Sequence, residues 1–60
     1  MNKAQFKIKL KELRKKGITN ADIAKKTRYS TMTVDRASGN FGDASKRFYE
    51  IFNSKYGAIQ

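Results

Sequence analysis

Apolar residues recur at helical spacing in several short segments of this chain, and capping or turn residues separate the segments. Phe6, Leu10 and Leu13 fall at positions i, i+4 and i+7, which predicts one apolar stripe on a helix over residues 3–16. Phe6, Ile8 and Leu10 also alternate with lysine, which is a strand pattern. The strong helix propensity of KELRKK favours the helix.

Two shorter helices are predicted in the middle of the chain. Thr19 is a typical N-cap, and Asp22 three residues later gives a near capping box for a helix over residues 20–27. Ser30 is the next N-cap, and it predicts a third helix over residues 31–38. Only a tight turn is left to join these two helices.

The last predicted helix covers residues 43–56, with Asp43 as its N-cap. The four segments together predict an all-α fold, a compact bundle of about four helices with a central helix-turn-helix, in a single domain over residues 1–60. The apolar faces of the helices give the expected core: Phe6, Leu10, Leu13, Ile18, Ile23, Ala24, Val34, Ala37, Phe48, Ile51, Phe52 and Tyr56.

Positive charge is the strongest signal in the composition. Fourteen Lys and Arg residues against five Asp and Glu residues give a net charge of +9 over 60 residues. The excess is uneven, because residues 1–28 carry a net +8 and residues 29–60 a net +1. A small domain with such a field attracts polyanions, and nucleic acid is the first candidate partner.

Several function classes are disfavoured by residues that the sequence lacks. It has no Cys and no His, no paired carboxylates on one helix face and no phosphate-cradling loop, so we expect neither an enzyme nor a metal or cofactor site. No apolar run approaches the roughly 20 residues of a membrane span. The apolar residues form a complete core pattern and no Trp could anchor the chain at an interface, so we expect no membrane partner. The lack of cysteine suits a reducing, cytoplasmic location.

The third predicted helix has two unlike sides. At 100° per residue, Val34 and Ala37 lie about 60° apart and are predicted to be buried, with Ser30 beside them. The other side is then expected to be exposed and carries side chains of mixed chemistry: Thr31, Met32, Asp35 and Arg36. Such a short helix after a tight turn is typical of a helix-turn-helix, whose second helix enters the major groove.

The segment LKELRKKGITNADIAKKTRYSTMTVDRASGN resembles the helix-turn-helix of the phage Cro and CI repressor family, the XRE-like proteins. It covers residues 10–40, and residues 41–57 suit the following helix of that family. STMTV alone also resembles the LacI-type headpiece, in which the motif starts at the beginning of the chain. The Cro and CI likeness rests on GIT before the second helix and on these residues: Leu10, Leu13, Arg14, Ile23, Ala24, Ser30 and Val34.

Three residues depart from the family pattern. Arg28 stands in the turn where the family usually has Gly, and a left-handed conformation there costs about 1 kcal/mol. Thr27 and Ala37 replace larger apolar residues. All three substitutions are expected to lower the stability of the domain.

The resemblance implies that Thr31, Met32, Asp35 and Arg36 are the base-reading residues. Their chemistry agrees, since Arg can bond guanine O6 and N7, and Met and Thr methyl groups can pack on a thymine methyl. For Asp35 three roles stay open: accepting from cytosine N4, orienting Arg36, or repelling wrong sites.

Phosphate contacts are expected at the ends of the helices and on basic side chains. Asn20 begins the second helix, where backbone N–H groups and the helix dipole favour an anion. The remaining predicted phosphate contacts are Arg14, Lys25, Asn40, Ser45 and Lys46.

The sequence therefore predicts a sequence-specific double-stranded DNA-binding protein, a transcriptional repressor of the Cro and CI type. The family binds palindromic operators as dimers, so we expect a weak or DNA-induced homodimer, with Tyr49 as a candidate contact. The initial Met favours a complete short protein over one domain of a longer repressor. Two alternatives stay open: a protein-interaction module of the same fold, such as an antirepressor or antitoxin, and a basic membrane-surface peptide.

Overall fold

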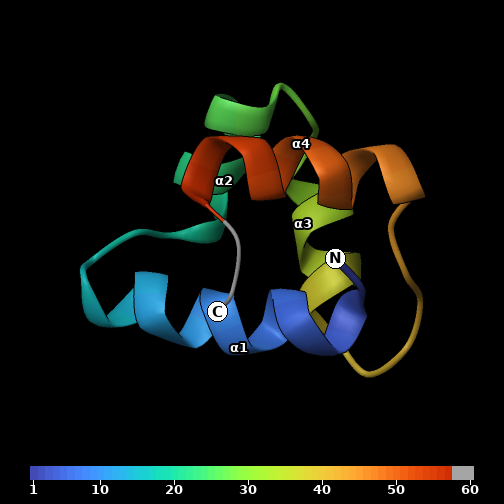
Figure 1. Ribbon diagram of the computed structural model, residues 1–60, viewed down its shortest axis with the longest axis horizontal. Coiled ribbons are helices and arrows are strands. Elements are labelled where there is room, and N and C mark those ends of the chain that lie inside the picture. Colours follow the sequence, from blue (N-terminus) through green and yellow to red (C-terminus); the bar gives the residue numbers. More distant parts are fainter. Residues whose placement is uncertain (58–60) are drawn as a thin grey trace.

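The computed structural model describes residues 1–57 and places four α-helices in them: α1 (Lys3–Lys15), α2 (Asn20–Thr27), α3 (Thr31–Ser38) and α4 (Lys46–Tyr56). In Figure 1, α1 lies along the bottom of the view and α4 along the top, and α3 spans the distance between them. α3 packs against both α1 and α2, while α4 packs against α2. The predicted all-α bundle is confirmed.

Aromatic rings from α1 and α4 form the centre of the core. The ring of Phe6 lies 4.7 Å from that of Phe52 and 5.6 Å from that of Phe48, both edge to face. Tyr29, just before α3, places its ring 5.2 Å from Phe48. Edge-to-face pairs of this kind add stability beyond the burial of their area. The rings therefore hold α4 against α1 and against the turn before α3.

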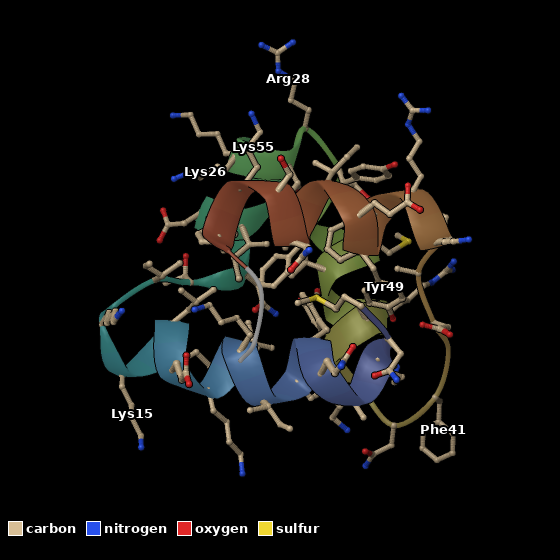
Figure 2. All side chains as sticks on the ribbon, viewed as in Figure 1. Lys15, Lys26, Arg28, Phe41, Tyr49 and Lys55 are labelled. Carbon is tan, nitrogen blue, oxygen red and sulfur yellow. The ribbon has the colours of Figure 1, made fainter. Side chains whose placement is uncertain are left out.

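The predicted core is correct at most positions and wrong at two. Ile51 is only half-buried and, unlike Ile18 and Tyr56, does not pack against the core. Tyr49, which was predicted to be exposed on a dimer surface, is only 5% exposed and belongs to the core. Figure 2 shows Tyr49 on the side of α4 that faces α1. Ile18 and Tyr56 are half-buried and pack against the edge of the core.

The start of α4 also differs from the prediction. Ser45, not Asp43, is the N-cap, and its hydroxyl accepts a hydrogen bond from the Phe48 N–H at 3.2 Å. The Asp43 carboxylate instead accepts hydrogen bonds from the Ala44 N–H and from the Tyr49 hydroxyl. These bonds, led by that of the Tyr49 hydroxyl, hold the pKa of Asp43 below its usual value. Asp43 thus ties the loop before α4 to the helix.

The connection between α2 and α3 depends on one left-handed residue. Arg28 has φ 64° and ψ 30°, a left-handed conformation that only glycine adopts without strain. The chain reverses there, and the Tyr29 N–H bonds the Ala24 carbonyl at 3.0 Å. Thr27 is buried, but its hydroxyl donates to the Ile23 carbonyl at 2.8 Å, so it leaves no polar group unsatisfied.

Replacing Arg28 with Gly should therefore stabilise the fold. We expect Arg28→Gly to raise the free energy of unfolding by about 1 kcal/mol, because the left-handed strain of a residue with a Cβ disappears. Urea unfolding followed by circular dichroism measures the change. Gly17→Ala, at φ 85°, should have the opposite sign. If the urea concentration at the midpoint of unfolding is unchanged or lower for Arg28→Gly, the wild-type Arg28 backbone is not strained.

The Tyr49 phenol should make stability decrease at alkaline pH. Burial, with the hydrogen bond to Asp43, raises the pKa of Tyr49 from its usual 10.0 to about 12. The stabilising contribution is therefore complete below pH 10 and is lost as the pH rises from about 10 to 12. The stability difference between the wild type and Tyr49→Phe should shrink over that interval in urea titrations. A stability difference that stays constant up to pH 12 would contradict this role of the Tyr49 phenol.

Candidate nucleic-acid interface

The two sides of α3 differ sharply in burial. Val34 and Ala37 are completely buried, whereas Met32 is 63% exposed. The other predicted base-reading residues, Thr31, Asp35 and Arg36, are exposed as well. The predicted orientation of the helix is therefore confirmed. Met32 in particular is not a core residue, although it is one of the larger apolar side chains of the chain.

Ser30 does not lie on the buried side, where the helical wheel had placed it. It is exposed, because it sits at the N-cap rather than within the helix. Its hydroxyl accepts from the Thr33 N–H at 3.2 Å and also lies 3.0 Å from the Thr33 hydroxyl. Ser30 thus defines where α3 begins.

Lys3 fixes the other end of α3. Its Nζ donates to the Arg36 carbonyl at 2.8 Å and to the Gly42 carbonyl at 2.6 Å. The last carbonyls of a helix lack partners within the helix, and a cation there also opposes the negative end of the helix dipole. Lys3 therefore closes the C-terminal end of α3 and holds the following loop against it.

Gly42 lets this loop adopt a left-handed turn beside Arg36. Its φ of 95° is readily adopted only by glycine, and a Cβ built on it would lie 3.7 Å from the Arg36 Cβ and Cγ. Nearby, the Lys7 Nζ donates to the Asn40 Oδ1 at 3.1 Å. Asn40 is exposed, and its side-chain amide hydrogens are bonded to no acceptor within residues 1–57.

Asn20 joins three helices through its side chain. The Arg14 Nη2 donates to the Asn20 Oδ1 at 3.2 Å, and the Asn20 Nδ2 donates to the Asp35 Oδ1 at 2.8 Å. Residues from α1, α2 and α3 are therefore linked at the N-terminal end of α2. Asp35 is bonded to Asn20 and not to Arg36, since the one ion pair among residues 1–57 joins Lys9 to Glu12.

Sequence reasoning missed the specific contacts of the basic side chains on α1. Lys3, Lys7 and Arg14, which we call the basic stripe, lie next to the apolar stripe and contact α3, its following loop and Asn20. Their spacing of four and seven residues places them on one face of a helix. This spacing was a signal that could have distinguished them from the other lysines of α1.

The remaining predicted phosphate contacts lie on the surface of α2 and α4. Lys25 and Lys46 are exposed. Ser45 is exposed too, although its hydroxyl already caps α4. Arg28 projects from the turn at the top of Figure 2, and Phe41 projects from the loop after α3 at the lower right. The basic side chains are thus spread over several faces of the molecule.

Comparisons with protein families, with curated proteins and with solved structures find no match to this chain. Within residues 1–57, no helix is long and apolar enough to cross a bilayer. The same part of the chain brings together no group of three Asp or Glu side chains that could hold a metal ion.

The role of Lys3 in closing α3 can be measured directly. We expect Lys3→Met to lower the free energy of unfolding by about 1 kcal/mol, because the Arg36 and Gly42 carbonyls lose a charged donor. Lys11→Met, on the exposed face of the same helix, removes the same charge and should change stability far less. Equal effects of the two variants in urea unfolding would contradict a specific role for Lys3.

Proposed function

We propose that this protein binds double-stranded DNA in a sequence-specific manner and acts as a transcriptional repressor of the Cro and CI type. The observation that carries the proposal is the exposed face of α3. Met32 and Arg36 are exposed on it, while Val34 and Ala37 on the opposite face are buried in the core. An apolar and a cationic side chain exposed on one short helix suit the methyl groups and acceptors of base edges.

The dimensions of α3 support insertion into the major groove. An α-helix with its side chains is about 10–12 Å across, close to the major-groove width of about 12 Å. The net charge of +9 supplies the attraction to the phosphates that such a small domain needs. Both ends of the helix are fixed, by Ser30 and by Lys3, so little ordering is required on binding.

Each exposed residue of α3 has a proposed role. Arg36 bonds guanine O6 and N7, and Thr31 and Met32 pack on a thymine methyl. Asp35 faces an amino group of a base. The phosphates on either side are bound by the N-terminal end of α2 at Asn20 and by a second set of side chains: Arg14, Lys25, Asn40, Ser45 and Lys46.

The operator is proposed to be a palindrome with half-sites about 34 Å apart, bound by two copies. Because Tyr49 is buried, it cannot form the contact between them. The exposed positions of α4 carry mainly charged side chains, among them Lys46, Arg47 and Glu50. Pairing on DNA, where phosphates neutralise this charge, therefore fits better than a stable dimer in solution.

The protein-interaction alternative has less support. It predicts exposed aromatic residues on α3 or α4, whereas Phe48, Tyr49 and Phe52 are all buried. The exposed aromatic side chain among residues 1–57 is Phe41, 91% exposed on the loop after α3. The face of α3 therefore suits a nucleic acid better than a protein.

Arg36 and Lys46 should give two distinct mutant phenotypes. Selection from a random duplex pool first identifies the preferred site. Arg36→Ala should then lose about 1–3 kcal/mol and relax the preference at one base pair. Lys46→Ala should weaken all sequences alike and reduce the slope of log K against log salt by about one. Fluorescence anisotropy at several salt concentrations measures both.

Two results would overturn the proposal. One is the absence of any enriched sequence with the wild type at moderate salt. The other is an Arg36→Ala variant that keeps the full affinity and preference of the wild type. Binding to anionic liposomes with the same strength and salt dependence as to DNA would favour a membrane-surface role instead.

A further inference from the structure

The chain of hydrogen bonds from Arg14 through Asn20 to Asp35 ends on the exposed face of α3. Asn20 is half-buried at the first position of α2, while Arg14 and Asp35 are exposed. Each bond has one charged partner, and the bond from Asn20 to Asp35, at 2.8 Å, is shorter than the 3.2 Å bond from Arg14. The conformation of Asp35 is thus set by a residue of another helix.

The chemistry of the two partners determines how the Asn20 amide is oriented. An arginine guanidinium can only donate, so the amide oxygen faces Arg14. An ionised aspartate can only accept, so the amide nitrogen faces Asp35. Reversing the amide would set two acceptors together and two donors together. Arg14 therefore orients Asn20, and Asn20 orients Asp35.

This arrangement uses one carboxylate oxygen of Asp35 and leaves the other as an acceptor. Oδ1 accepts from Asn20, and among residues 1–57 no donor is bonded to Oδ2. An acceptor on the face of α3 attracts an exocyclic amine in the major groove and repels carbonyl oxygens such as guanine O6 and thymine O4. Cytosine N4 suits it best, because adenine presents its N7 acceptor beside N6.

We propose that Asn20 is a positioning residue that holds Asp35 as an acceptor for cytosine N4, so that the pair selects a C·G base pair at one position of the site. This inference rests on the proposed function, since it needs α3 in the major groove. It gives Asp35 the role of a base reader and not of a partner for Arg36. It also gives Asn20 an effect on base preference in addition to any phosphate contact.

The test compares base preference at every position of the selected site for four variants: Asn20→Ala, Asp35→Ala, the double variant and Lys25→Ala. Asp35→Ala should lose roughly tenfold discrimination at a single position that the wild type reads as cytosine. Asn20→Ala should lose part of the discrimination at that same position and leave the others unchanged. The double variant should match Asp35→Ala, because the two residues act as one unit.

Lys25→Ala is the matched control, since Lys25 lies exposed on the same helix and forms no bond with Asp35. It should lower affinity for all sequences without changing the preference at any position. Thermal unfolding of each variant shows that the fold is retained. A purely structural role for Asn20 would lower the melting temperature and weaken all sequences together.

The outcomes separate this inference from the proposed function. If the wild type enriches no sequence, the proposed function fails. If the wild type enriches a site but Asn20→Ala leaves every preference unchanged, or its effect adds fully to that of Asp35→Ala, the positioning role is wrong. At the position where Asp35→Ala loses its base preference, the wild type should prefer cytosine. A wild-type preference for adenine, guanine or thymine there would overturn the assignment of cytosine.

Discussion

The insertion of Phe6 between the aromatic rings of α4 is the contact on which the rest of the fold depends. Phe6 is completely buried, and its ring meets those of Phe48, Tyr49 and Phe52. A chain of 60 residues without cysteine has no disulfide between its first and last helices. Noncovalent packing must therefore hold the two helices together. It also sets the position of α1, whose basic stripe then reaches α3 and the loop after it.

Helical periodicity predicted the fold well because most contacts within each helix are local. The ranges expected for α2 and α3 coincide with the observed ones, and Phe6, Leu10 and Leu13 are buried as their spacing indicated. The errors occur where a side-chain contact outside the helical pattern decides. Asp43 suits an N-cap by type, but the Tyr49 hydroxyl holds its carboxylate elsewhere. The Tyr49 ring is buried because it packs against Phe6 of α1, a contact that no local pattern reveals.

The candidate site was predictable as a face but not as a network. The spacing of Val34 and Ala37 was enough to predict that Met32 and Arg36 are exposed. If one side of a helix is buried, the opposite side faces solvent. The bonds of Lys3 and Asn20 were beyond the same reasoning, because they join residues 33 and 15 positions apart. The side chains of lysine and asparagine can hydrogen-bond to many different groups. Only the tertiary packing determines which of these groups becomes the partner.

The basic stripe has a consequence for how this molecule responds to electrolytes. Lys3 and Lys7 already donate to carbonyl or amide oxygens of the protein, so their charges are less available to displace cations condensed on a polyanion. The formal charge of +9 therefore overstates the number of ions that the molecule exchanges with its surroundings on association. Part of the positive charge of this sequence stabilises the fold through intramolecular hydrogen bonds.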